Sequence, residues 1–563
     1  MKRVLLWGAG TIIALATAAA AQDAKLPYRW MYVSRNLSSD EQLAGIEDLV
    51  RAGAEHGING MVLSADLELL DRQPEANVER LRRLRAFCDE QGVEIIPIIC
   101  SAGYGGSVLA RNPNLAEGIP VEDALFVAHG DTAVLEPDPP ITFANGGFEE
   151  YEGDEFAGFA FIDKPGVISF ADAGVKHSGD ASLRFEAIAA GDPTHGHARA
   201  MQELSVAPRR HYVVRAWVKT EDFAAADRFA IQVYAGERAI APVSVSVPPT
   251  TDWMPIAISF NSLAYDRVRI YLGVWGGTTG QMWLDDIAVE EAGLSNVLRR
   301  PGTPIVVRGE ASGIEYEEGR DFARIEDPRL GHYSDEHDGP SIQLLPGGRI
   351  TDGERLRVSF YHGARVNEGQ VTVCMSEPEV YEIWRDAIRR IEEVLHPPIY
   401  FLSMDEVRAG GTCAACKARG LSMAEILGDC ITRQFQMIRE VKPGAEVVVW
   451  SDMLDPNHNA HGDYYLVEGD FSGSWKHVPS DLIMACWDYD VRDKSLSFFS
   501  GLGFRTLGGA YYDGNDLTNP AGWIDSLLAT PNAAGIMYTT WQDKYALLGG
   551  FGDLVREKAG PAE

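Results

Sequence analysis

Apolar runs and amphipathic stretches alternate over the first hundred residues of the chain. Segments 30–33, 60–63 and 93–100 are apolar except for Glu94, which is typical of strands buried on both faces. The stretches between them carry apolar side chains at helical spacing, as in 38–56. This alternation predicts parallel strands connected by helices.

The alternation stops between about residues 141 and 292. Short apolar segments such as 212–218 and 268–274 follow one another with turn residues between them. Without a helical stripe of any length, this pattern is typical of an all-β sandwich. The Pro-rich segment 137–140 marks its start, and residues 303–362 continue as a smaller β-rich region with glycine turns.

The alternation of apolar runs with amphipathic stretches resumes at Ser376 and predicts five further strands. Three strands before the interruption and five after it predict an α/β fold, a (β/α)8 barrel. The β-sandwich, of jelly-roll type, and the β-rich segment are then inserted after the third barrel strand. A doubly wound open sheet is the alternative, but no glycine-rich phosphate loop supports it. The predicted domains are 28–136 (barrel, first part), 137–293 (sandwich), 294–362 (β-rich insert) and 363–556 (barrel, second part).

The first 21 residues have the composition of a secretory signal. Lys2 and Arg3 precede an apolar run over 4–18, and small residues stand at the expected cleavage position, 19–21. The run is short for a membrane span, and no later run is long enough. We expect a secreted or periplasmic protein without a membrane span after cleavage.

Composition narrows the classes of partner. The 563 residues carry a formal net charge of −32 and are 45% hydrophobic. Such a chain can bury a large core, but it lacks the basic surface that nucleic-acid binding requires. We therefore expect no nucleic-acid partner, and we interpret the acidity as a solubilising surface.

Seven cysteines are present, and Cys413 and Cys416 form the one close pair, in Cys-Ala-Ala-Cys. A single CxxC is a weak zinc signal. A disulfide or two packed thiols suits an oxidising compartment better. All three states are left open by the sequence.

Reactive side chains of such barrels gather at the C-terminal ends of the strands. The residues at these strand ends include aromatic rings, carboxylates and an arginine, a combination that suits a sugar. The C–H faces of a sugar stack on indole rings, and its hydroxyls bind carboxylates and guanidinium groups. An oligo- or polysaccharide is therefore the predicted partner, with Asp452 among the substrate-binding residues. The strand ends carry Arg35 (first), Asp405 and Glu406 (fourth), Trp450 and Asp452 (fifth), Trp487 and Asp488 (sixth), Tyr511 and Asp513 (seventh), and Trp541 and Asp543 (eighth).

Glycosidic cleavage needs a carboxylic acid that holds its proton near neutral pH. The adjacent Asp405 and Glu406 offer one, because a neighbouring negative charge and apolar walls both favour the protonated form of a carboxyl. Retaining glycoside hydrolases with a (β/α)8 barrel and a nucleophile of their own commonly carry this nucleophile as a glutamate at the end of the seventh strand. Its carboxyl lies about 5 Å from that of the general acid. Here that strand ends in Tyr511-Tyr512-Asp513, so the usual nucleophile is missing.

The barrel segments 28–100 and 376–552 resemble glycoside hydrolase family 20, the β-N-acetylhexosaminidases, whose Asp-Glu pair also follows the fourth strand, as in Ser403-Met-Asp405-Glu406-Val407. The resemblance implies an exo-acting, retaining hydrolase without a catalytic cofactor. Glu406 would be the general acid/base, and Asp405 would orient the 2-acetamido group that attacks the anomeric carbon. For substrate binding it implies Arg35, Asp513 and Asp543 (hydroxyls), Tyr511 (acetamido oxygen), and Trp450, Trp487 and Trp541 (pocket walls).

Two departures make the chain a distant relative of that family. The acidic, His-containing motif after the third strand is replaced by Cys-Ser-Ala-Gly-Tyr-Gly-Gly over 100–106, and no N-terminal α/β domain is visible. The inserted sandwich resembles carbohydrate-binding modules of families 4 and 9 in segments 145–149, 177–183, 216–219 and 283–287. This resemblance implies a structural calcium at Glu149 and Asp285.

Three other hypotheses stay open. The same barrel could act on a non-acetylated sugar, or the chain could be a noncatalytic glycan-binding protein. A metal-dependent hydrolase would use His458 and His461, which share a loop with Asp452 and Asp455. Because no known metal-ligand spacing is met there, a hydrogen-bonded loop facing the substrate is favoured.

Overall fold

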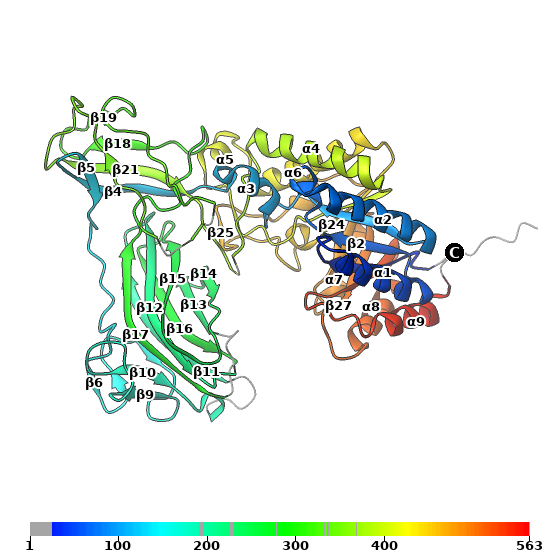
Figure 1. The fold of residues 1–563 in the computed structure, drawn as a ribbon, viewed down its shortest axis with the longest axis horizontal. Helices are drawn as coiled ribbons and strands as arrows, with labels where there is room; N and C mark the ends of the chain where they lie inside the picture. Colours follow the sequence, from blue (N-terminus) through cyan, green and yellow to red (C-terminus); the bar gives the residue numbers. More distant parts are fainter. Residues whose placement is uncertain are drawn as a thin grey trace, which may run out of the picture.

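The computed structural model describes residues 25–561, except 191–195, 225–228, 277–278, 332, 335–336 and 368. A barrel with its helices lies at one end, and the antiparallel sheets lie at the other (Figure 1). The predicted signal segment, 1–21, lies outside the described residues. In the part of the chain that is described, no helix is both long enough and apolar enough to cross a membrane.

Eight strands close into a barrel, each pairing in parallel with its neighbours. Closure comes from the pairing of the first strand with the last, where Tyr28 lies opposite Gly535. The predicted eight-stranded barrel, with three strands before the insertion and five after it, is confirmed. In order around the barrel the strands are β1 (Tyr28–Ser34), β2 (Gly60–Ser64), β3 (Glu94–Ile99), β22 (Ile399–Leu402), β24 (Glu446–Trp450), β26 (Ile483–Cys486), β27 (Arg505–Tyr511) and β28 (Ala533–Thr539).

The barrel strands are apolar on both faces because each face meets a different core. Side chains such as Val62, Phe401 and Val448 fill the barrel interior, and the alternate side chains pack against the surrounding helices. Among the described residues, the α-helices are α1 (Asp40–Glu55), α2 (Glu75–Gln91), α3 (Gly106–Arg111), α4 (Pro378–Leu395), α5 (Ala414–Ala418), α6 (Met423–Val441), α7 (Arg492–Gly501), α8 (Thr518–Ala529) and α9 (Leu548–Ala559).

One barrel helix is missing. Residues 451–482, all of them described, connect β24 to β26 through short turns and no α-helix. This segment is rich in Asp, Asn, Gly and His and lacks apolar side chains at helical spacing. In the described part of the chain, the short 3-10 helices are η1 (Leu67–Arg72), η2 (Pro113–Leu115), η3 (Ile188–Ala190), η4 (Asp452–Leu454) and η5 (Ser474–Lys476).

The sandwich consists of two five-stranded antiparallel sheets with a shared apolar core between them. Their alternating buried and exposed positions explain the period-two pattern in the sequence. One sheet has the order β15 (Thr251–Asn261), β12 (His211–Glu221), β17 (Gln281–Glu291), β10 (Ser182–Phe185) and β9 (Ser169–Asp172). The other has the order β14 (Arg238–Ser244), β13 (Phe229–Ala235), β16 (Arg267–Trp275), β11 (His197–Ser205) and β8 (Phe161–Ile162).

A six-stranded sheet with its own core connects the sandwich to the barrel. Two of its strands precede the sandwich in sequence. Residues 119–135 therefore belong to this sheet, whereas the domain prediction placed them in the first part of the barrel. Pairing between β4 and β21 spans more than 220 positions, which local patterns cannot reveal. Its order is β19 (Glu315–Tyr316), β18 (Val306–Gly309), β21 (Arg355–His362), β4 (Ile119–His129), β5 (Thr132–Leu135) and β20 (Ile342–Gln343); two small pairs are β6 (Tyr151–Glu152) with β7 (Glu155–Phe156) and β23 (Ala409–Gly410) with β25 (Leu466–Val467).

Candidate active site

A cavity of about 810 Å³ lies at the C-terminal ends of the barrel strands. We call it the barrel cavity. Its lining joins carboxylates to aromatic rings, and it includes five of the residues predicted from the strand ends. These are Asp405, Glu406, Trp450, Trp487 and Trp541.

Glu406 follows β22 with its main chain held on two sides. Its φ of +50° lies in the left-handed region, which non-glycine residues adopt mostly at constrained sites. The Glu406 N–H donates to Asp452 Oδ2 at 2.9 Å, and the Glu406 carbonyl accepts from Gln370 Nε2 at 2.7 Å. These contacts fix the direction in which the Glu406 side chain leaves the barrel.

Both carboxylate oxygens of Glu406 have partners inside the cavity. The Tyr104 hydroxyl donates to Oε2, and the Arg408 guanidinium lies 2.8 Å from Oε1. Arg408 is itself buried, donates to Gln370 Oε1 at 2.5 Å and lies over the Tyr465 ring. Glu406 is therefore held as a hydrogen-bond acceptor in this state.

Asp405 has a different electrostatic environment from its neighbour. Burial, followed by the negative charges of Asp452 and Glu406, raises the pKa of Asp405 to about 7. The Ser403 hydroxyl donates to Asp405 Oδ1 at 3.0 Å and opposes this shift in part. Of the adjacent pair, Asp405 is thus a group that keeps a proton close to neutral pH.

Aromatic rings from four strand ends form one wall of the cavity. The Trp487 and Tyr512 rings are parallel with centroids 6.0 Å apart. The Trp541 ring is 49% exposed and lies 5.0 Å from Tyr32 and 6.3 Å from Tyr512. Trp450 closes the floor against Phe401. An exposed indole beside other rings offers a platform for the apolar face of a sugar.

Tyr511, predicted to bind substrate, does not line the cavity; Tyr512 does. Tyr511 is 3% exposed and stacks on Tyr538 at 4.2 Å beneath the helices. Three consecutive residues, Tyr511, Tyr512 and Asp513, have positive φ. This backbone turn breaks the strand alternation, so the second tyrosine takes the position expected for the first.

Three further predicted substrate ligands have other partners. Arg35 and Asp543 pair with each other at 2.7 Å, and neither lines the cavity. Asp513 accepts hydrogen bonds from the Thr540 hydroxyl and from the Trp541 N–H at 2.8 Å. Its observed role is to hold the loop that presents Trp541.

Asp452, also predicted to bind substrate, is fully buried behind the cavity. Its Oδ2 accepts from the Glu406 N–H and from Asn459 Nδ2, each at 2.9 Å. Burial also raises the pKa of Asp452. The residue therefore positions Glu406 and adds negative potential at Asp405, and it cannot touch a ligand in this arrangement.

Several cavity residues were missed by sequence reasoning. Tyr32 lies inside β1, where its aromatic ring reads as core, and Tyr104 stands in the segment 100–106 that was noted as a departure. Arg408 follows the acidic pair by two residues, a spacing that could have drawn attention to it. Gln370 comes from the segment that returns from the insertion, so only the fold brings it here.

The predicted calcium ligands, Glu149 and Asp285, belong to no group of three or more converging ligand atoms among the described residues. Glu149 accepts from the Asp180 N–H, and Asp285 accepts from the N–H groups of His177 and Ser178. Backbone donors thus hold both carboxylates. The calcium site stays a prediction.

The other two metal hypotheses have different outcomes. His458 packs edge-on against Trp487, and His461 bonds to the adjacent Gly462 carbonyl; neither is in a converging ligand group of the described chain. Cys413 and Cys416 are free thiols, not a disulfide. They do converge with two further groups, outside the barrel cavity.

The sequence matches no protein-family model and no curated protein. Solved structures give weak similarities. One is a β-N-acetylhexosaminidase with 8% identity and a TM-score of 0.39, matched over 94% of this chain and 72% of that chain. Another is a rhamnosidase from Novosphingobium sp. PP1Y with 12% identity and a TM-score of 0.32, matched over 92% and 55%.

Carbohydrate-binding modules match about a quarter of the chain. TmCBM61, solved in complex with β-1,4-galactotriose, has 19% identity and a TM-score of 0.21 over 27% of this chain and 98% of its own. A family 4 module has 17% identity and a TM-score of 0.20. All these TM-scores are below 0.5.

Proposed function

We propose that this chain is a glycoside hydrolase that binds a sugar in the barrel cavity and cleaves its glycosidic bond with the Asp405–Glu406 pair. The observation that carries the proposal is the convergence of this pair with three indole rings in one cavity of about 810 Å³. That volume lies in the usual range for small-ligand sites. The signal-like composition of residues 1–21 supports action on glycans in the periplasm or outside the cell.

The pair can supply one proton at neutral pH. In the free site the proton resides on Asp405, because burial and two neighbouring charges raise its pKa to about 7, while Glu406 accepts from Tyr104 and Arg408. A substrate amide N–H that donates to Asp405 favours its carboxylate form. The proton then becomes available to Glu406, which faces the glycosidic oxygen.

The nucleophile in this proposal is the 2-acetamido group of the substrate. Its carbonyl oxygen bonds to the anomeric carbon as the bond to the leaving oxygen breaks, and Glu406 gives that oxygen its proton. Water, deprotonated by Glu406, then attacks the anomeric carbon and opens the ring that formed. Tyr512 occupies the seventh-strand position where retaining barrels with their own nucleophile carry a carboxylate, which favours this route.

The test compares wild type with Glu406→Gln on matched aryl glycosides that carry or lack a 2-acetamido group. We expect turnover of the acetamido substrate and a loss of about 10²–10⁴-fold in the variant, the usual contribution of a general acid. The control is Glu393→Gln, which changes an exposed glutamate on α4 that does not line the cavity. Full activity of Glu406→Gln would refute the assignment.

The same experiment separates the alternatives. Turnover of the substrate without the acetamido group would identify a hydrolase for non-acetylated sugars. Quenching of tryptophan fluorescence by oligosaccharides, with no product formed by wild type, would identify a noncatalytic glycan-binding protein. That readout is available because Trp450, Trp487 and Trp541 line the cavity.

A further inference from the structure

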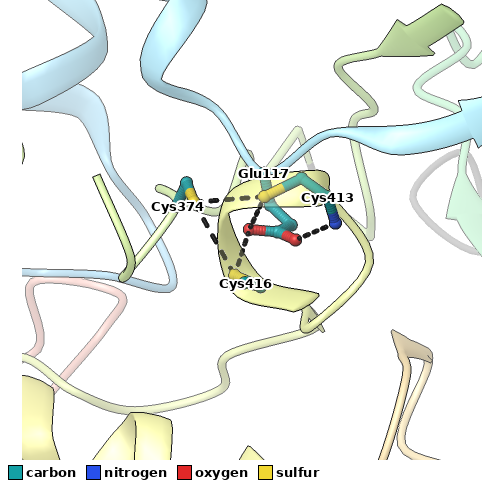
Figure 2. A group of neighbouring side chains, drawn as sticks. All are labelled: Glu117, Cys374, Cys413 and Cys416. Atoms are coloured by element: carbon teal, nitrogen blue, oxygen red, sulfur yellow. Dashed lines mark hydrogen bonds between the residues drawn. The ribbon is translucent and has the colours of Figure 1, made fainter. Parts of the chain in front are cut away.

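Four potential metal ligands meet in a closed cluster away from the barrel cavity. They are Glu117, Cys374, Cys413 and Cys416, which we call the thiol–carboxylate cluster. One ligand atom from each lies within 4.8 Å of all the others, and all four residues are buried. Figure 2 shows the three sulfur atoms and one carboxylate oxygen turned toward a common centre.

The spacing of these atoms matches the edges of a tetrahedral zinc site. With Zn–S bonds of about 2.3 Å, tetrahedral geometry places two sulfurs about 3.8 Å apart and a sulfur and an oxygen about 3.5–3.7 Å apart. Cys374 Sγ lies 3.4 Å from Cys413 Sγ and 3.8 Å from Cys416 Sγ. Glu117 Oε2 lies 3.8 Å from Cys413 Sγ and 3.6 Å from Cys416 Sγ.

A disulfide does not explain this arrangement. The S–S bond of a disulfide is about 2.05 Å, and all three cysteines are free thiols. Three sulfurs also cannot pair evenly, and packed thiols alone give no reason for a buried carboxylate among them. Burial of an acidic group is costly, and the positive charge of Arg300 offsets that cost only in part.

The Glu117 carboxylate is oriented like a metal ligand. Its Oε1 accepts three hydrogen bonds, from Thr412 N–H at 2.9 Å, Thr412 Oγ1 at 2.9 Å and Cys413 N–H at 3.0 Å. Oε2 is left to face the sulfurs. Hydrogen bonds that fix the non-ligating atom of a side chain are typical of metal sites.

We propose that the thiol–carboxylate cluster binds one structural zinc ion through Cys374, Cys413 and Cys416 sulfurs and Glu117 Oε2. Soft thiolates select zinc over calcium or magnesium. Four protein ligands complete a tetrahedron and leave no position for substrate, as in structural zinc sites. Three thiolates and one carboxylate carry the same charge as four thiolates, the ligand set of all-cysteine zinc sites.

The position of the cluster indicates what the ion would stabilise. Glu117 precedes β4, where the chain leaves the barrel, and Cys374 lies where it returns, before α4. Around them, Glu117 N–H donates to the Thr372 carbonyl at 2.8 Å and Cys374 N–H to the Leu115 carbonyl at 2.9 Å. Cys413 directly precedes the short helix α5, and Cys416 lies on this helix, between β22 and α6. The ion therefore fastens both ends of the insertion to the barrel.

The first experiment measures the zinc content of the full-length protein, purified without chelators, by elemental mass spectrometry. We expect about one zinc per chain in wild type, the stoichiometry of one tetrahedral site. Glu117→Gln and Cys416→Ser are expected to retain under about a tenth of it. The matched control, Cys88→Ser, removes a buried thiol of α2 outside the cluster and should keep its zinc.

A second experiment does not depend on the variants folding. Wild type is stripped with a chelator, and its thermal unfolding is recorded before and after addition of zinc or cobalt. We expect a lower Tm in the stripped protein, recovery with zinc, and the absorption bands of thiolate-bound tetrahedral cobalt. Both readouts are independent of glycosidase activity, so they stand whether or not the proposed function holds. A disulfide within the cluster, or wild type that neither contains nor binds zinc, would overturn the proposal.

Discussion

Two acidic groups in this protein both have a raised pKa and differ in what they face. Burial raises the pKa of Asp405 to about 7 and that of Glu117 also to about 7. Asp405 faces a cavity of about 810 Å³ beside a second carboxylate, an arginine and aromatic rings. Glu117 faces three sulfurs and does not line the barrel cavity.

The comparison shows that a shifted pKa alone does not identify a chemical role. A perturbed carboxyl that reaches a cavity can exchange its proton with a ligand, which is what acid–base catalysis requires. A perturbed carboxyl that is closed off among thiols can lower its free energy by losing its proton to bind a cation. Access and partner set therefore distinguish the two sites, and they can be tested separately.

The largest expected effect is that of Asp405→Asn on activity. Asp405 keeps its proton up to about pH 7, where its raised pKa lies, so kcat/KM of wild type should fall as pH rises through 7. In the variant we expect a loss of about 10²–10⁴-fold and the disappearance of this limb from the pH–rate profile. In Glu117→Gln the limb should keep its position, because that carboxyl lies outside the cavity. If Asp405→Asn keeps the fall of kcat/KM near pH 7, Asp405 is not the group that titrates there, and the proposed difference between the Asp405 and Glu117 sites is wrong.

A smaller effect is expected from Asp452, which acts through Glu406 and Asp405. Asp452→Ala removes the acceptor of the Glu406 N–H, and displacement of a catalytic group commonly costs about 10²-fold in kcat. KM should change little. Asp452→Asn keeps an acceptor oxygen but removes a charge that raises the pKa of Asp405.

The Asn variant at this position should therefore recover most of kcat and move the alkaline limb to lower pH. A purely structural role would not move the limb. If Asp452→Ala and Asp452→Asn are equally impaired and keep the wild-type pH profile, the positioning role is wrong.

Tyr512 and Tyr511 provide a matched pair with a still smaller effect. Tyr512→Ala removes a ring that lies parallel to Trp487 in the cavity wall, and we expect KM to rise about 10-fold, equivalent to one stacking contact. Tyr511→Phe, beneath the helices on Tyr538, should leave the kinetics within about twofold. The opposite ranking would restore the assignment made from the sequence alone.

The sequence was sufficient for the barrel because that information is local. Apolar runs such as those of β22 and β24 predict buried parallel strands. Ser422 and Glu425 form a capping box at the start of α6, as the two residue types and their spacing indicate. The adjacency of Asp405 and Glu406 is likewise visible along the chain. These features depend on neighbours a few residues apart.

The rest depends on contacts between distant segments or on backbone turns. Glu117 and Cys374 are separated by the whole insertion, so the weak Cys413–Cys416 signal could not be completed from the sequence. A run of positive φ angles decides which tyrosine enters the cavity. Arg35 is drawn away from it by Asp543, a pairing that spans the first and last strand ends.

The smallest expected effect concerns stability and returns to Asp405. Its pKa of about 7 in the folded protein exceeds the unfolded value of about 3.9, so its protonated form stabilises the fold. That stabilisation is present below about pH 4 and is lost as pH rises to 7. Asn imitates the neutral carboxyl at every pH, so Asp405→Asn should gain about 1 kcal/mol relative to wild type between pH 5.5 and 8, since solvent in the cavity screens part of the full shift. Urea unfolding of both chains at the two pH values measures this difference. The zinc contribution cancels because both chains keep the thiol–carboxylate cluster, and a pH-independent difference would mean that Asp405 is ionised throughout.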